Sequence, residues 1–377
     1  MYEFINADFY DGYEIIFLLL FLISFILCFG ISLFGNKIGL PSRAIVDAKA
    51  VQRAHTGTVP RLGGVALIFC LLIYPLLLNL FGLQAVNGIW LVITAIPIFL
   101  YGLVEDIGFL ISPRKRILGA VLSGLSAILY FGVWIKSTSI PGLDWLLGFA
   151  PIGLFFTLFA VAGVCNSFNL IDGLNGLSSY VAISAAISLA IIAFQVGYLD
   201  LSIFMIFVVS STFGFFLFNF PLGRVFLGDS GAYMLGHVLV WSAILLINFD
   251  SQVSPFAVLL VFFWPVADTG LAIWRRGILE NAATRPDRLH FHQLAMRFIE
   301  IKVFGRGKRA FSNPIATLLI IPLITTPQIL GVSFASNTPL LAIFSLIMVI
   351  LFVLTYLIGI KLARNHGPLK ITNRKSK

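Results

Sequence analysis

The segment Asn166-Ser-Phe-Asn-Leu-Ile-Asp-Gly-Leu-Asn-Gly176 joins two long apolar runs, and the rest of the chain is organised around it. Asn166, Asn169 and Asp172 recur every third residue, so on a helix they lie on one side. Gly173 and Gly176 loosen the backbone and let a ligand approach closely. Ionisable groups at a membrane boundary are costly unless paired, so this segment is a candidate functional site. The alternative is a polar turn with a glycine helix stop.

The composition is that of a membrane protein. Of the 377 residues, 59% are hydrophobic and only 11% are charged, whereas a soluble chain has about 25% charged residues. We therefore expect an all-α, polytopic integral membrane helix bundle with a single domain over residues 1–377. The net charge of +9 does not indicate nucleic acid binding here, because the placement of the cations is what matters. Cys28, Cys70 and Cys165 lie in apolar segments and form no metal-binding pattern.

The apolar runs are long enough to cross a bilayer, which takes about 20 residues per helix. The N-terminus is acidic, and the first cation, Lys37, follows the first apolar run, so the N-terminus is predicted outside and the C-terminus in the cytoplasm. With this topology, all of the 25 Lys and Arg residues except Lys136 lie inside, including a basic tail over 361–377. About eleven spans are expected, at residues 15–34, 62–82, 86–104, 117–134, 149–165, 177–196, 201–219, 230–247, 253–274, 314–334 and 338–360.

The first two inside segments carry polar clusters. Arg61 precedes a glycine pair, which makes that stretch more than an ordinary basic loop. Glu105 and Asp106 are adjacent at the end of a span, and Arg114 and Arg116 follow them. Neighbouring carboxylates repel each other and need a metal, a cation or a shared proton. The alternative for this pair is a helix end that meets water.

Two later inside segments add further candidates. Asp229, in Phe-Leu-Gly-Asp-Ser-Gly, opens a span, where it caps a helix or holds a hard metal that carries phosphate oxygens. His290 and His292 stand beside Arg288, in a loop that could bind zinc or phosphate. Zinc requires more ligands than this loop supplies, and the guanidinium favours an anion. Asp268, within a span, is expected to support the site.

Together these carboxylates, histidines and cations on one membrane face are suited to binding phosphates with magnesium. No Gly-x-x-x-x-Gly-Lys-Ser/Thr motif occurs, so a nucleoside triphosphate is not the expected donor.

At this point the motifs resemble those of the polyprenyl-phosphate N-acetylhexosamine-1-phosphate transferases, the WecA/MraY superfamily of glycosyltransferase family 4. The resemblance runs from residues 37 to 294, and Pro-Asp-Arg-Leu-His-Phe-His is similar to the WecA-like branch. Three positions depart from the family pattern. The family usually has Asp at the position of Glu105, often has Asp at Asn175, and commonly has a third His at Gln293.

The resemblance implies transfer of N-acetylhexosamine-1-phosphate, with GlcNAc as the first choice, from a UDP-sugar to undecaprenyl phosphate. UMP is released, the reaction starts a lipid-linked surface polysaccharide such as O-antigen, and Mg²⁺, or Mn²⁺ in its place, is required. The site is expected on the cytoplasmic face of the bacterial inner membrane, in a chain that forms a homodimer. The expected catalytic residues are Glu105, Asp106, Asp172 and Asp229, of which Asp172 and Asp229 hold the metal. The expected substrate-binding residues are Arg61, Arg114, Arg116, Asn166, Asn169, Asp268, Arg288, His290 and His292.

Other functions remain open. A donor with a 6-deoxy-sugar (FucNAc or QuiNAc) and MraY-like transfer of phospho-MurNAc-pentapeptide are alternatives within the enzyme class. A secondary transporter is the alternative from another class, but transporters place ionisable groups near the bilayer midplane and often contain inverted repeats. Here the charges lie at span ends, and no repeat is evident.

Overall fold

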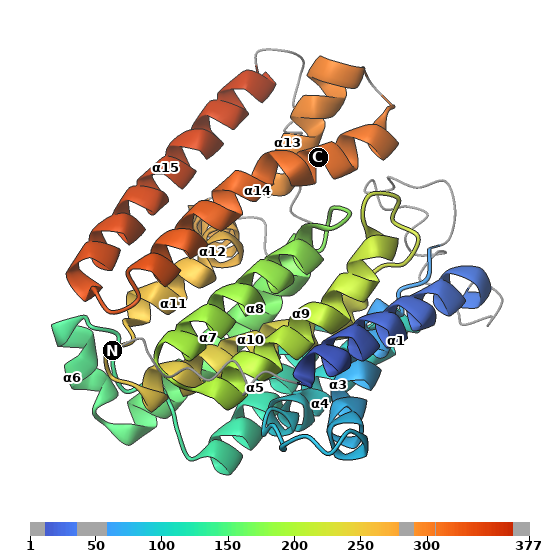
Figure 1. The fold of residues 1–377 in the computed structure, drawn as a ribbon. Helices are drawn as coiled ribbons and strands as arrows, with labels where there is room; N and C mark the ends of the chain where they lie inside the picture. Colours follow the sequence, from blue (N-terminus) through green and yellow to red (C-terminus); the bar gives the residue numbers. More distant parts are fainter. Residues whose placement is uncertain (1–11, 36–58, 279–289, 306, 365–377) are drawn as a thin grey trace.

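The computed structural model describes residues 12–35, 59–278, 290–305 and 307–364. Over these residues the chain forms helices and turns and no strand (Figure 1). Within a bilayer, only helices and closed barrels satisfy every backbone N–H and C=O group. The predicted all-α membrane bundle is therefore confirmed for the described part of the chain.

The helices follow the predicted apolar runs closely. The first half of the chain contains α1 (Tyr13–Phe34), α3 (Gly63–Leu80), α4 (Ile89–Asp106), α5 (Pro113–Phe131), α6 (Pro141–Leu147), α7 (Ala150–Ile171) and α8 (Leu177–Gln195). The second half contains α9 (Leu199–Asn219), α10 (Gly228–Phe249), α11 (Pro255–Val261), α12 (Phe263–Ile278), α13 (Phe291–Ile299), the π-helical turn η3 (Glu300–Phe304), α14 (Arg309–Ser333) and α15 (Thr338–Arg364). Helix α7 extends beyond its predicted end, so Asn166 and Asn169 are helical and Asp172 follows the last turn.

The number of spans differs slightly from the prediction. Nine of the described helices have the length and hydropathy to cross a membrane, and there are ten such spans if the bent pair α11–α12 counts as one. Helix α5 accounts for the eleventh predicted span. It has 19 residues, but its first turn contains Arg114, Lys115 and Arg116, which lower its hydropathy at that end.

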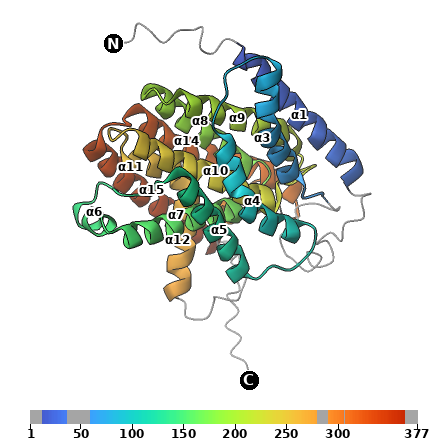
Figure 2. The same cartoon turned by 90° about the horizontal axis from the view of Figure 1, so that it is seen from below.

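The span predicted at 253–274 is bent. Helices α11 and α12 meet at a bend of 79°. Pro265 lies in the first turn of α12, where a proline is tolerated because its missing N–H would have no intrahelical partner. Beyond the bend α12 leads away from the bundle (Figure 2), and Ile273 and Trp274 near its end are exposed. Asp268, closer to the bend, is buried.

Helix α10 lies in the middle of the bundle (Figure 2), and 78% of the residues in its 18-residue apolar stretch are buried. Glycines on its neighbours let it approach them closely. A Cβ atom on Gly102 of α4 would lie 2.4 Å from the backbone nitrogen of Ser230, and one on Gly64 of α3 would lie 2.4 Å from that of Gly231. Small residues at helix contacts are typical of membrane bundles. This packing brings the ends of α3, α4 and α10 together.

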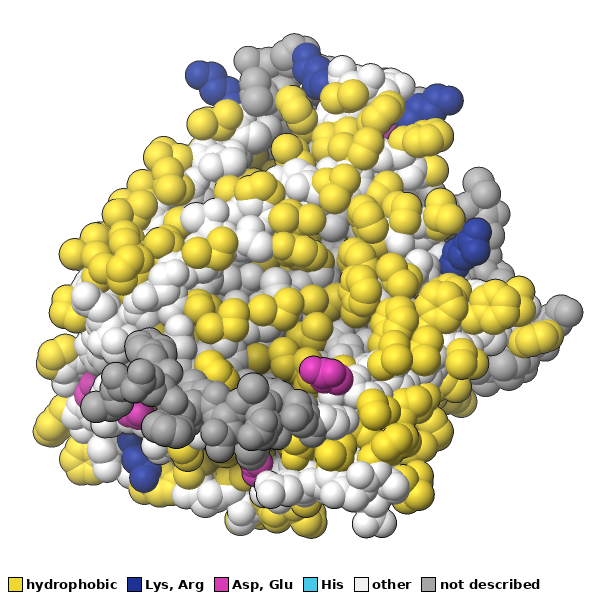
Figure 3. Space-filling model, in the orientation of Figure 1, with side chains coloured by type: hydrophobic (Ala, Val, Ile, Leu, Met, Phe, Trp, Pro, Cys, Tyr) yellow, Lys and Arg dark blue, Asp and Glu magenta, His cyan; other side chains and the backbone are white. Residues whose placement is uncertain are grey.

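The surface agrees with a membrane location. Figure 3 shows one face that is largely hydrophobic, with most of its visible Lys and Arg side chains along the upper and right edges. Large apolar side chains such as Leu18, Leu129 and Phe155 are exposed, as expected where lipid replaces water. The orientation of the termini across the membrane stays a prediction.

The first testable prediction concerns that orientation. A fluorescent protein fused to the C-terminus should fold and fluoresce, and alkaline phosphatase fused there should be inactive, because the basic segments hold the tail in the cytoplasm. The matched control is the same pair of reporters inserted at Lys136, the one cation predicted outside. Reporter activities in the opposite sense would place the charged helix ends outside and contradict a cytoplasmic site.

Candidate active site at the ends of helices α4, α7 and α10

The carboxylate of Asp106 fixes the start of α10. Its Oδ1 accepts a hydrogen bond from the backbone N–H of Asp229 at 2.8 Å, and its Oδ2 accepts from the N–H and the hydroxyl of Ser230 at 2.9 and 2.7 Å. The first N–H groups of any helix have no partner within the helix. Asp106, the last residue of α4, therefore caps α10 from a neighbouring helix.

Gly228 makes this contact possible. Its φ of 79° lies in the left-handed region, and a Cβ atom there would lie 2.5 Å from Oδ2 of Asp106. A larger residue at this position would be strained and would also push the carboxylate away. The glycine is thus needed for the cap.

Arg61 joins the two carboxylates. Its Nη2 donates to Oδ1 of Asp229 at 2.9 Å, and its Nε lies 3.4 Å from Oδ1 of Asp106. The backbone around Arg61 pairs with the chain before α10: the N–H of Phe226 donates to Pro60 at 2.9 Å, and that of Gly63 donates to Phe226 at 3.0 Å. The structure therefore brings three predicted site residues together.

Asp172 follows α7 and belongs to the same charged cluster. Its side chain is half-buried. Burial is the main cause that raises the pKa of Asp172 to about 7; the charges of Asp229 and Asp106 act in the same direction, and Arg61 opposes them. In the part of the chain that the structure describes, the carboxylates of Asp106, Asp172 and Asp229 thus gather around Arg61. A cluster of carboxylate oxygens of this kind suits a divalent cation such as magnesium.

The loop after Asp172 is held by side chains that lie outside the sequence motifs. Asn313 accepts from the N–H of Asn175 at 2.7 Å, Asn219 accepts from the N–H of Gly176 at 2.6 Å, and the hydroxyl of Thr317 donates to the carbonyl of Asn175 at 2.8 Å. Of these three, Asn219 is 43 residues from the loop in sequence and Thr317 is 142 from it, so no periodic pattern could have revealed them.

Asn175 itself has a structural role. Its Nδ2 donates to the carbonyl of Pro221 at 2.8 Å. A carboxylate has no proton to donate at neutral pH, so an Asp at this position could not make the same bond. This accounts physically for one of the departures from the family pattern.

Glu105 and Arg116 form an ion pair beside the cluster. The Nη2 of Arg116 donates to Oε1 of Glu105, whose side chain is almost completely buried. Arg116 also interacts with the buried hydroxyl of Tyr233 on α10. Arg116 was expected to bind substrate and Glu105 to be catalytic. Their mutual pairing favours a positioning role for both.

The remaining predicted residues near α7 and α5 are less engaged. Asn166 is half-buried and donates to the carbonyl of Ala162, one turn back in its own helix, at 2.8 Å. Asn169 is half-buried on the last turn of α7, and Arg114 is exposed on the first turn of α5. Arg288 lies outside the described residues.

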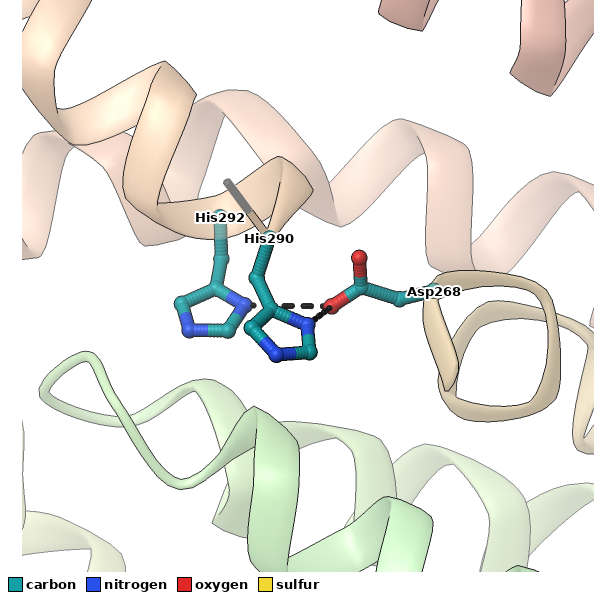
Figure 4. Close-up of side chains that lie close together, drawn as sticks. All are labelled: Asp268, His290 and His292. Atoms are coloured by element: carbon teal, nitrogen blue, oxygen red, sulfur yellow. Dashed lines mark hydrogen bonds and ion pairs between the residues drawn. The ribbon is translucent and has the colours of Figure 1, made fainter. Parts of the chain in front are cut away.

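The two predicted histidines share one carboxylate (Figure 4). Oδ2 of Asp268 lies 3.2 Å from Nδ1 of His290 and 3.3 Å from Nδ1 of His292, and Oδ1 accepts from the N–H of Phe291 at 3.0 Å. All three side chains are buried. A carboxylate bound at Nδ1 sets the orientation of each ring and directs its Nε2 away, as is common for histidines that hold a ligand.

His292 connects this group to the carboxylate cluster. Its Nε2 is buried and has no hydrogen-bond partner in the part of the chain that the structure describes. A Cβ atom on Gly173 would lie 2.6 Å from that nitrogen. The ring therefore faces the loop that begins with Asp172. A buried nitrogen without a partner at this place suits an anion or another ligand.

The same three residues also have the spacing of a metal site. One ligand atom each from Asp268, His290 and His292 lie within 4.8 Å of one another. The pairing of both Nδ1 atoms with one carboxylate is explained by hydrogen bonds without a metal. An anion bound at Nε2 is therefore the ligand that we expect at the histidine pair.

The comparisons with known proteins agree with the motifs. Residues 88–247 match the family "Glycosyl transferase family 4", which confirms the predicted family resemblance. The chain is 26% identical to the undecaprenyl-phosphate alpha-N-acetylglucosaminyl 1-phosphate transferase of Yersinia pestis over 289 residues, 75% of this chain and 76% of that protein. It is also 26% identical to a probable undecaprenyl-phosphate N-acetylglucosaminyl 1-phosphate transferase of Bacillus subtilis (strain 168), over 67% of this chain and 70% of the relative.

The second prediction separates positioning from substrate binding at Arg116. Arg116→Ala leaves the buried carboxylate of Glu105 without this partner, and breaking a buried pair costs about 3–5 kcal/mol; partial exposure of Arg116 places the expected loss near the lower value. Thermal unfolding of the purified protein should show a clear fall in Tm. Arg114→Ala, an exposed neighbour, is the control and should leave Tm unchanged. If Arg116→Ala keeps the wild-type Tm but loses affinity for the lipid phosphate, the positioning role is wrong.

The third prediction concerns His292. His292→Ala should abolish most activity, and metal analysis of the purified wild-type protein should find no stoichiometric zinc, because Asp268 engages both Nδ1 atoms and the two Nε2 atoms are fewer ligands than zinc takes from proteins. The control is His237→Ala, which removes a buried histidine of α10 distant in sequence from this group. One zinc per chain, lost in His292→Ala and retained in His237→Ala, would instead identify a metal site.

Proposed function

Because residues 88–247 match glycosyl transferase family 4, we propose that the chain transfers GlcNAc-1-phosphate from UDP-GlcNAc to undecaprenyl phosphate, with release of UMP. The names of the relatives support the acceptor and the transferred group. The observation that carries the proposal is the joint placement of Asp106, Asp172, Asp229 and Arg61 at the ends of membrane helices, next to the histidine pair. A charged site at a span end suits a lipid acceptor and a water-soluble donor.

The acceptor needs little activation. A phosphate monoester has a second pKa of about 6 and is mostly dianionic at neutral pH, so a strong base is not required. The main obstacle is the repulsion between two anionic substrates, which cations relieve. In the proposed reaction, an oxygen of the lipid phosphate attacks the β-phosphorus of UDP-GlcNAc. A new P–O bond forms between them, and the bond from the same phosphorus to the oxygen of the leaving UMP breaks. One phosphoanhydride replaces another, so no other energy source is needed.

Asp172 and Asp229 are the residues that would hold magnesium, with manganese as a substitute. Their carboxylates fit a hard cation, since both supply oxygen ligands and the charge of Asp229 acts on Asp172. Bound there, the ion would screen the phosphate charges and stabilise the leaving phosphate. Asp106, occupied by the start of α10, would position Asp229 and Arg61 rather than accept a proton.

The histidine pair is assigned to the donor. Asp268 holds both rings, and the Nε2 of His292 faces Gly173, one residue after the proposed metal ligand Asp172. A donor pyrophosphate placed between them would meet the histidines on one side and the carboxylate cluster on the other. Arg288 completes this group in the proposal. The site is proposed on the cytoplasmic face of the bacterial inner membrane, in a homodimer.

A single assay, the release of UMP, distinguishes the rival functions. Purified protein supplied with UDP-GlcNAc and undecaprenyl phosphate should release UMP, and release should require both substrates. A panel with UDP-FucNAc, UDP-QuiNAc and UDP-MurNAc-pentapeptide identifies the donor, with UDP-GlcNAc expected to be fastest. Uptake of a solute into vesicles without UMP release would identify a transporter.

The fourth prediction concerns Asp229. Asn retains the ability of Asp to accept a hydrogen bond, so Asp229→Asn should fold and insert normally. It removes a carboxylate from the proposed metal site, so UMP release should fall to nearly nothing and excess magnesium should restore little. EDTA should silence the wild type, and magnesium or manganese should restore it.

The control is Asp250→Asn, which removes a carboxylate just after the opposite end of the same helix and should keep full activity. If Asp229→Asn turns over at a near-normal rate with an unchanged magnesium requirement, Asp229 serves only as a partner of Arg61. The metal would then have to be sought at Asp172 or Glu105.

A further inference from the structure

The segment that joins the histidine pair to α14 exposes large apolar side chains. Val303 is 65% exposed and Phe311 is 60% exposed, and Phe298, Ile301 and Phe304 are also exposed. They come from the end of α13, from η3 and from the first turn of α14. Together with the exposed cations Arg297, Lys302 and Lys308 they form what we call the basic-apolar face. Isolated apolar residues on a surface are ordinary, but a contiguous run of this kind marks an interaction site.

The same face is positively charged. Arg297, Lys302 and Lys308 are exposed, and no described carboxylate forms an ion pair with them. Glu300 is the only acidic residue between His290 and Asn313. Its carboxylate is turned inward, where it accepts from the N–H of Gly307 at 3.0 Å and lies 3.4 Å from Nε of Arg309. The face thus presents cations and apolar groups without an exposed acid.

The position of α14 places this face at the membrane surface. A helix of 25 residues is about 37 Å long at 1.5 Å per residue, whereas the hydrocarbon core is about 30 Å thick. The ends of α14 therefore reach the headgroup layer, and η3 comes directly before its first turn. In the shared orientation of Figures 1 and 3, the start of α14 lies at the upper edge, where Lys and Arg side chains stand among hydrophobic ones.

From these observations we propose that the basic-apolar face lies in the headgroup layer of an anionic leaflet and binds acidic phospholipids there. Val303, Phe304 and Phe311 would enter the boundary of the acyl chains, and Lys302 and Lys308 would reach the lipid phosphates along their flexible stems. Apolar residues interleaved with lysines are the pattern of segments that lie in the membrane interface. The inference concerns lipid binding and does not depend on the proposed transferase reaction.

The contact has a structural consequence for the candidate site. Helix α13 begins beside His290, and its buried side packs Phe291 on Trp264 of α12 and on Phe352 of α15. Lipid held at the far end of the same short helix would keep α13, and with it His292, at a fixed depth in the membrane.

The depth of the face can be measured directly. Cys28, Cys70 and Cys165 are all buried, so Val303→Cys offers one accessible thiol for an environment-sensitive fluorophore. In bilayers of phosphatidylcholine and phosphatidylglycerol, the emission should shift to the blue and should be quenched by lipids brominated near the headgroup. Strong quenching by iodide in water, with none by the brominated lipids, would show that the face lies in water and would overturn the proposal.

The preference for acidic lipid is tested by charge removal. Retention of phosphatidylglycerol by the purified protein, measured by native mass spectrometry, should fall about fivefold for each lysine removed in Lys302→Gln and Lys308→Gln. Lys136→Gln is the matched control, because that lysine lies over the ring of Trp134 in another part of the chain, and it should change nothing. Equal retention by all variants, or equal retention of phosphatidylcholine and phosphatidylglycerol, would refute the charge-based contact. Loss of added undecaprenyl phosphate alone would assign the lysines to the acceptor instead.

Discussion

The hydrogen bonds from the start of α10 to the carboxylate of Asp106 are the interaction on which the candidate site depends. Helix α10 is the central helix, and Asp229 and Ser230 at its start are buried. Leaving backbone N–H groups there unpaired would cost several kcal/mol, of the order of a lost hydrogen bond in an apolar medium. One side chain on α4 satisfies two of them together with the Ser230 hydroxyl. The cap thereby sets the position of Asp229, and Arg61 follows because it pairs with both carboxylates.

This arrangement explains the glycines in the motifs. Gly64, Gly102 and Gly228 are needed because backbone or carboxylate atoms occupy the space that a side chain would fill. Gly173 was expected to let a ligand approach the backbone. In the structure the His292 ring takes up that space, so the glycine serves the contact between two parts of the site. Glycine is needed at all four positions for the same reason, because another group approaches the backbone too closely for a side chain to fit.

The sequence predicts the parts of this protein that depend on local composition. Spans were found because a helix must be apolar over its whole length to cross lipid, and the charged candidates were found because they interrupt such runs. The bend between α11 and α12 was missed because hydropathy is continuous through Phe262. The partners of Asn175 and the pairing of Arg116 with Glu105 were missed because they depend on packing between segments, which one sequence does not contain.

The candidate site has two halves that meet at a single loop. Helices α4 and α10 and the chain around Arg61 supply the carboxylate half, and α12 and α13 supply the histidine half through Asp268. The carboxylate of Asp172 interacts with the charges of the first half, and Gly173 lies against the ring of His292 in the second. The loop that carries both residues is held by Asn219 at the end of α9 and by Asn313 in α14. Its backbone therefore has little freedom, and the separation of the two halves is set by helices that contribute no charged group to either. A site that must bring two anions into contact requires such a fixed separation, since a small error in distance would be magnified by their repulsion.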